Sequence, residues 1–167
     1  MKRFLVILFL VNIISGCIKE DVTGADIKVG DMLPGFEVLM NDGSVANDAF
    51  LKGSVSIVMF FHTSCPDCQQ ALPRVQQIYD EYASKGVKTV LISREEGLDD
   101  ISDYWSRNGL DLPYSAQNDR KVYELFASSR IPRIYISDEN GTVRYIFTDD
   151  PVPSYDDLKS ALESLIR

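Results

Sequence analysis

The sequence predicts an α/β domain: a central mixed β-sheet flanked by helices, with an N-terminal β-hairpin extension and an insertion after the second parallel strand. Two nearly continuous β-branched and aromatic runs, 55–61 and 87–93, are typical of strands buried on both faces of a parallel sheet. The segment between them has helical periodicity, which completes a β-α-β unit. Asp-Gly and Asn-Gly pairs at 42–43 and 140–141 predict tight hairpin turns toward the two ends of the domain.

Each element follows from its own local pattern. The helix expected at 66–84 has Leu72, Val75 and Ile78 at helical spacing, and Gly86 ends it. Ser154 is a candidate N-cap for the last helix, whose apolar positions face the sheet. The remaining elements expected are a hairpin of 36–40 and 44–46, helices at 98–107 and 119–127 on either side of a short segment at 112–116, and a second hairpin of 134–137 and 142–147.

Length and composition fit one globular domain. The chain has 167 residues, of which 45% are hydrophobic and 25% charged, enough for one sizeable core. The formal net charge of −8 argues against nucleic acid as a partner. We expect the domain to span 29–167 and to need no metal or organic cofactor.

The first residues predict a lipoprotein leader. Two basic residues precede an apolar run from Phe4 to Ile14. The length of this run is well below the roughly 20 residues of a membrane-spanning helix. The ending Ile14-Ser15-Gly16-Cys17 resembles a bacterial lipobox. We therefore expect a signal peptide at 1–16, a lipid anchor on Cys17 and a tether over 17–28. This places the mature chain in the cell envelope, outside the cytoplasm, in the periplasm or at the cell surface. The alternative is a plain secretory peptide that leaves one extra thiol.

The segment Cys65-Pro66-Asp67-Cys68 follows the first buried strand directly. Cys65 is expected near a helix N-terminus, where unpaired backbone N–H groups favour a thiolate and depress a cysteine pKa to roughly 3.5–7.5. An i, i+3 spacing in the first turn brings two Cα atoms to about the 5.5 Å that a disulfide prefers. The pattern therefore predicts a redox-active pair.

Two other interpretations of this pair are weaker. A structural zinc site needs four ligands, and this segment offers two cysteines, with His62 as the only histidine of the chain. A purely structural disulfide would add little stability, because the loop it closes is so short that it constrains the unfolded chain only slightly.

The pair resembles the active site of the thioredoxin superfamily. Pro73 lies where thioredoxins carry the proline that kinks their active-site helix, and Ile131-Pro132 resembles their cis-proline loop, which packs beside the disulfide and offers a backbone edge to the substrate. The Gly-Asp-x-Leu-Pro-Gly-Phe segment at 30–36, the lipobox and the insertion are most similar to the AhpC/TSA-related TlpA/ResA-like thiol-disulfide oxidoreductases, membrane-tethered proteins of bacterial envelopes. The resemblance covers 29–167.

This resemblance implies protein thiol and disulfide substrates and a membrane thiol protein as electron donor. Three positions depart from the family pattern. Ser64 replaces the usual tryptophan before the first cysteine, and Met59 replaces a buried acid, so no proton shuttle for Cys68 comes from there. Ala71 replaces a glutamate of the cytochrome-maturation branch, which argues against a role in haem protein maturation.

Several polar residues near the pair have two interpretations each. Asp67 either tunes the pair toward a reductant or stabilises its helix end. His62 either stabilises a thiolate or packs at the end of its strand. Arg130 and Arg133 either border a substrate groove or are solvated loop charges, and the solvated interpretation is preferred.

The predicted function is thiol-disulfide exchange on envelope proteins, with Cys65 attacking, Cys68 resolving and Pro132 holding the substrate backbone. Two alternatives stay open. A peroxiredoxin-like thiol peroxidase fits Cys65-Pro66, although that class has threonine where this chain has His62 and lacks the cis-proline. A non-catalytic binding lipoprotein on the same scaffold is the other, since a fold does not fix a function.

Overall fold

A five-stranded mixed sheet forms the centre of the computed structural model, which describes residues 26–166. Its strand order is β5-β4-β3-β6-β7. The strands β3, β4 and β5 are parallel, whereas β6 pairs antiparallel with β3 and β7 antiparallel with β6. The sheet strands are β3 (Ser56–Phe61), β4 (Lys88–Ser93), β5 (Tyr114–Ser115), β6 (Arg133–Ser137) and β7 (Val143–Phe147).

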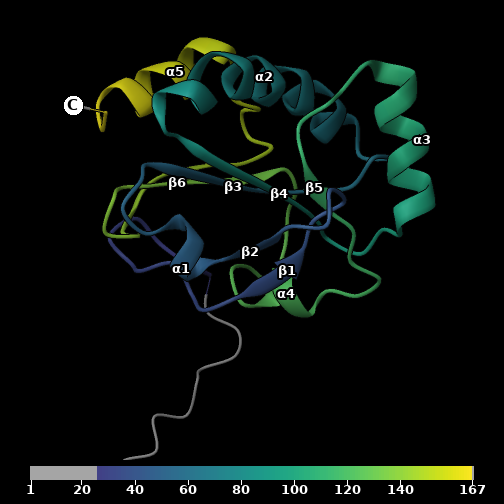
Figure 1. Ribbon diagram of the computed structural model, residues 1–167, viewed down its shortest axis with the longest axis horizontal. Helices are drawn as coiled ribbons and strands as arrows, with labels where there is room; N and C mark the ends of the chain where they lie inside the picture. The colour runs from purple at the N-terminus through teal and green to yellow at the C-terminus, as the bar shows by residue number, and fades with distance from the viewer. Residues whose placement is uncertain (1–25, 167) are drawn as a thin grey trace, which may run out of the picture.

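Helices and a separate hairpin cover the two faces of this sheet. The helices α2 and α5 lie on one face with α3 at their side, and the hairpin of β1 and β2 lies on the other with α1 and α4 (Figure 1). Together with the sheet they confirm the predicted fold class and the N-terminal hairpin. These elements are β1 (Glu37–Leu39), β2 (Val45–Asn47), α1 (Asp48–Leu51), α2 (Pro66–Tyr82), a 3-10 turn (Ala83–Lys85), α3 (Leu98–Asn108), α4 (Lys121–Glu124) and α5 (Tyr155–Glu163).

The strand β3 contributes to both layers of the core. All six of its residues are buried, as the continuous apolar run predicts for a central strand. Because alternate residues of a strand point to opposite faces, its last two aromatic rings pack in opposite directions. Phe61 packs on Trp105 of α3, with ring centroids 5.2 Å apart, and Phe60 packs on Tyr123 and Phe126 beneath the sheet, at 5.3 and 4.9 Å.

The local signals for turns and caps act as the sequence predicts. Gly43 and Gly141 close the two hairpins with φ angles of 85° and 83°, which strongly favour glycine. Ser154 caps α5: its side chain accepts from the Asp157 backbone N–H, and the Asp157 carboxylate accepts from the Ser154 N–H in return. These reciprocal bonds fix where α5 begins.

Two elements differ from expectation. The helix expected over 119–127 is a single turn, α4, after which the chain makes separate turns toward the start of β6. The helix α1 was not predicted, because one turn is too short to leave a periodic signal. It begins after Asn47, whose side chain accepts from the Phe50 N–H at 2.7 Å.

The chain already packs on the domain at Asp26, within the segment assigned to the tether. The Ile27 N–H donates to the Phe126 carbonyl at 2.9 Å, and Ile27 packs against the core. The expected leader, the acylated Cys17 and the rest of the tether lie outside the described residues. Among residues 26–166, no helix has the length and apolar character needed to cross a membrane.

Candidate active site

The two cysteines lie where β3 passes into α2. Cys65 is the N-cap residue of α2, with extended backbone angles of −81° and 118°, and Pro66 takes the first helical position, where a missing N–H costs nothing. Cys65 is half-buried, and Cys68, in the first turn, is fully buried. Both are free thiols. A partner molecule therefore reaches Cys65 first, with Cys68 behind it.

The loop before β6 packs beside Cys65. Its Ile131–Pro132 peptide bond is cis, as expected from the sequence. The Cys65 thiol lies 3.5 Å from the Ile131 carbonyl oxygen and donates to it. Ile131 and Pro132 are themselves buried. The structure thus brings Cys65 together with Ile131 and Pro132, which lie 66 residues or more further along the sequence.

Burial dominates the chemistry of Cys68. It raises the pKa of the Cys68 thiol well above its ordinary value, and the nearby Cys65 raises it further. The backbone N–H of His62 and the charge of Arg94 lower this pKa but do not compensate for burial. Cys68 is therefore held as a neutral thiol behind Cys65, and it needs a proton acceptor when it reacts.

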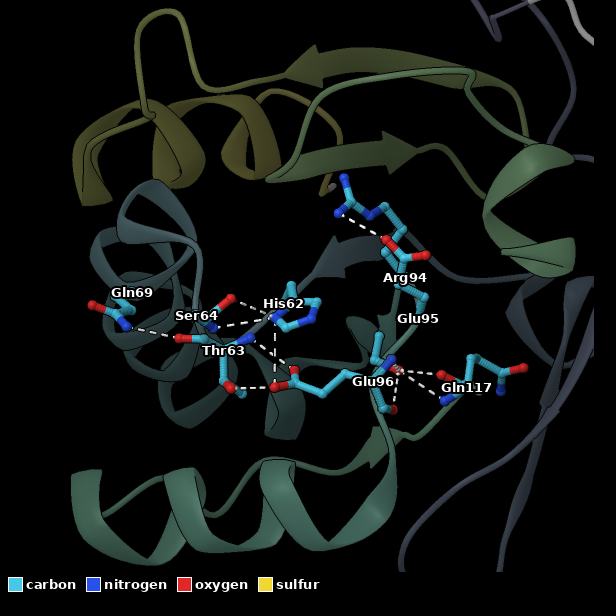
Figure 2. A network of polar contacts seen from close by, with 9 residues as sticks. His62, Thr63, Ser64, Gln69, Arg94, Glu95, Glu96 and Gln117 are labelled. Atoms are coloured by element: carbon cyan, nitrogen blue, oxygen red, sulfur yellow. Dashed lines mark hydrogen bonds and ion pairs between the residues drawn. The ribbon is translucent and has the colours of Figure 1, made fainter. Parts of the chain in front are cut away.

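A buried carboxylate that the sequence analysis missed supports the loop between β3 and α2. Glu96 is 6% exposed, and it accepts from the Thr63 backbone N–H at 2.7 Å and from the Thr63 hydroxyl. Figure 2 shows its side chain reaching across to Thr63 and His62. Thr63 in turn accepts from the Gln69 side chain of α2 at 2.7 Å. The carboxylate therefore connects the loop after β4 to the loop that carries the cysteines.

The backbone of Glu96 is fixed as firmly as its side chain. The Ser93 hydroxyl donates to the Glu96 carbonyl at 2.8 Å, and the Gln117 N–H donates to the same hydroxyl at 2.7 Å. One sequence signal was available for this residue. Glu96 follows three residues after Ser93, the end of the second parallel strand, and the carboxyl ends of parallel strands are where the sites of α/β folds gather.

His62 contacts the site in two ways. Its imidazole Nδ1 lies 3.0 Å from the Ser64 hydroxyl and 3.5 Å from a Glu96 carboxylate oxygen, and it accepts from the Ser64 N–H at 3.2 Å. Its backbone contacts both cysteines: the carbonyl accepts from the Cys65 N–H at 3.1 Å, and the N–H reaches the Cys68 thiol. Among the described residues, the His62 imidazole contacts Ser64 and Glu96, and the His62 backbone contacts the two cysteines.

The other polar candidates separate into different environments. Asp67 accepts from the Gln70 side chain at 3.3 Å in the first turn of α2, which fits its helix-end interpretation. Arg130 is exposed and pairs with Asp149 at 3.3 Å. The preferred interpretation of Arg133 as a solvated charge is wrong: this residue is 7% exposed and pairs with Asp26 at 2.6 Å. Its position at the start of a buried strand forces its side chain inside.

Of the three positions that depart from the thioredoxin pattern, Ser64 is exposed and the other two are enclosed. Met59 and Ala71 are fully buried, so neither place contributes an ionisable group. Among residues 26–166, no three His, Cys, Asp or Glu side chains are grouped as a metal ion would require. The reactive groups that the described part of the chain gathers here are the two thiols, the Glu96 carboxylate and the His62 imidazole.

Comparison with known proteins agrees with this geometry. The chain is 24% identical over 139 residues to the thiol-disulfide oxidoreductase ResA of Geobacillus thermodenitrificans (strain NG80-2), covering 83% of this chain and 79% of that protein. It superposes on the thioredoxin domain of a thiol-disulfide oxidoreductase from Bacteroides vulgatus with a TM-score of 0.74 and 17% identity, covering 85% and 100% of the two chains.

A third protein combines both kinds of likeness. It is a thiol:disulfide interchange protein of the thioredoxin family from Chlorobium tepidum TLS, with a TM-score of 0.72 and 26% identity, covering 86% of this chain and all of that one. The fold is thus thioredoxin-like, and the enzyme class is thiol-disulfide oxidoreductase. The family model for AhpC/TSA matches residues 29–146, and the chain therefore belongs to the AhpC/TSA family.

Proposed function

We propose that this enzyme exchanges disulfides with protein substrates in the cell envelope through Cys65 and Cys68. The observation that carries the proposal is the order of the two sulfur atoms. Cys65 is partly accessible at the N-terminus of α2, beside the Ile131 carbonyl, and Cys68 is buried one turn behind it. This order suits an attacking cysteine followed by a resolving one.

The reaction divides into two exchanges. The Cys65 thiolate attacks one sulfur of a substrate disulfide, so a Cys65–substrate bond forms as the substrate bond breaks, and the leaving thiolate takes up a proton. Cys68 then loses its proton and attacks the Cys65 sulfur, which closes the Cys65–Cys68 disulfide and releases the second substrate thiol. Two electrons pass to the substrate. Because the pKa of Cys68 is raised, the second exchange depends on a base that takes the Cys68 proton.

Pro132 and Ile131 are proposed to hold the substrate backbone during both steps. Their loop lies against Cys65, so an extended chain on it would bring its sulfur to that thiol. Pro66 and His62 shape the approach, Pro66 by fixing the first turn of α2 and His62 through its backbone contacts with both cysteines.

The proposed location rests on the leader. The pattern of 1–17 supports export and acylation of Cys17, which would keep the domain near a membrane, where another thiol protein re-reduces the pair. Incorporation of labelled palmitate into the natural chain, but not into a Cys17→Ser variant, would support the anchor. Equal labelling of both would refute it.

Insulin reduction tests the activity itself. With dithiothreitol as the electron source, the reduced full chain is expected to accelerate the reduction of insulin disulfides, and a Cys65→Ser variant to lose this acceleration. Retention of this acceleration in Cys65→Ser would refute the proposal, whereas absence of any acceleration by the natural chain would favour a binding lipoprotein. Rapid consumption of hydrogen peroxide without insulin reduction would favour the peroxidase instead.

A further inference from the structure

The carboxylate of Asp26 holds both ends of the loop that contains Ile131 and Pro132. One oxygen accepts from the Ser128 backbone N–H at 2.8 Å and from the Ser128 hydroxyl at 2.9 Å. The other accepts from the Arg133 guanidinium at 2.6 Å. A single side chain, more than 100 residues upstream in the sequence, therefore connects the two ends of the loop 128–133.

Arg133 makes this contact difficult to replace. The residue is 7% exposed and stands opposite Phe60 in the antiparallel pairing of β6 with β3. Among residues 26–166, Asp26 is the only carboxylate that pairs with it. A buried guanidinium without an anion is strongly unfavourable, so loss of Asp26 would drive Arg133 toward solvent and pull on the residue next to it, Pro132.

The loop also needs support from outside. Arg130 has a φ of 70°, a left-handed conformation that a residue with a side chain adopts only when its surroundings impose it. The Tyr123 hydroxyl donates to the Arg130 carbonyl at 2.7 Å and provides part of that support. Asp26 adds support at Ser128 and Arg133, on either side of this residue.

The same loop forms the wall beside the reactive sulfur. The Ile131 carbonyl lies 3.5 Å from the Cys65 thiol, between the two residues that Asp26 grips. Hydrogen bonding from Ser128 and the charge of Arg133 hold the pKa of Asp26 below its ordinary value, so this carboxylate is ionised whenever the protein is folded near neutral pH.

We propose that Asp26 is a positioning residue for the active site, which fixes the loop 128–133 so that Ile131 and Pro132 stand in place beside Cys65. This role rests on the proposed function, in which that loop holds the substrate backbone. The segment leading into the domain then holds the substrate-binding wall in place rather than serving as a passive link.

Two measurements on the full chain test this role, with Asp26→Asn compared to Asp31→Asn. The control removes a charge from the same segment. Among residues 26–166, the Asp31 carboxylate accepts a hydrogen bond from the Lys28 N–H and has none with the loop 128–133. The first measurement is hydrogen exchange followed by mass spectrometry. Asp26→Asn is expected to accelerate exchange in peptides covering 126–133, while Asp31→Asn leaves them unchanged.

The second measurement is the kinetics of insulin reduction. Asp26→Asn is expected to raise KM by roughly tenfold to a hundredfold with kcat within about twofold of the natural chain, because a misplaced binding loop weakens substrate binding. General destabilisation would lower kcat through loss of folded enzyme and leave KM unchanged. Ser128→Ala, which keeps Arg133 paired, is expected to raise KM in the same direction by a smaller factor.

The outcomes separate the two proposals. Unchanged exchange at 126–133 in Asp26→Asn, or an unchanged KM in an active enzyme, overturns the positioning role. If the natural chain does not reduce insulin, the proposed function fails, and faster exchange at 126–133 would still support Asp26 as the residue that holds the loop.

Discussion

Replacing Glu96 by alanine is expected to lower the free energy of unfolding by about 3 kcal/mol. The carboxylate accepts two hydrogen bonds from Thr63, which is 8% exposed, so neither donor regains water when the acceptor is removed. Hydrogen bonds to a charged group contribute about 1.5–3 kcal/mol each. Removing the carboxylate also relieves the cost of burying its charge, which offsets part of the loss. Glu96→Gln keeps one acceptor oxygen and is expected to cost about half as much.

Glu95→Ala is the matched control. The Glu95 carboxylate, next to Glu96 in the sequence, is 38% exposed and pairs with Arg94 and Arg120 at 3.0 and 3.3 Å. Surface ion pairs of this kind contribute about 0–1 kcal/mol to stability. Urea unfolding can be followed through Trp105, the only tryptophan of the chain, which is 5% exposed. If Glu96→Ala costs no more than Glu95→Ala, the carboxylate does not hold the loop between β3 and α2, and the argument for its role at the site fails.

The remaining predictions concern the cysteines and one helix cap. A Cys68→Ser variant is expected to accumulate a mixed disulfide between Cys65 and a substrate protein, which is visible as a band on a non-reducing gel. If this band is absent under conditions where the natural chain turns over, the proposed order of attack is wrong. Because burial raises the pKa of Cys68, the folded chain keeps this proton above pH 8.5, where an unfolded cysteine releases it. Stability of the reduced protein should therefore fall as pH rises beyond about 8.5, and Cys68→Ala should flatten this fall in urea titrations at pH 7 to 10. Ser154→Ala is expected to lower the free energy of unfolding by about 1 kcal/mol through loss of the α5 cap, whereas Ser160→Ala, on an exposed part of the same helix, should cost less.

Much of the fold and the position of the cysteine pair could be read from local patterns. Continuous apolar runs predict β3 and β4, because a strand covered on both faces has no polar side. Glycines at 43 and 141 predict the hairpins, because their backbone conformation strongly favours that residue. The expectation that Cys65 and Cys68 act as a pair follows from their i, i+3 spacing at the point where a buried strand leads into a helix. Each of these signals lies within a few residues of its consequence.

Tertiary structure decided which distant groups meet. Glu96 reaches Thr63 from 33 residues away, and Asp26 reaches Arg133 across 107 residues. Neither pair can be predicted from the sequence, because the local sequence around an acidic loop residue does not show whether its side chain faces water or a buried partner. The sequence alone therefore determined the order of the main strands and helices and indicated where the cysteine pair lies, through short-range propensity, periodicity and spacing. Only packing decided that Arg133 is buried and that Asp26 and Glu96 support the loops beside Cys65, because burial of a charge depends on what the rest of the chain places around it.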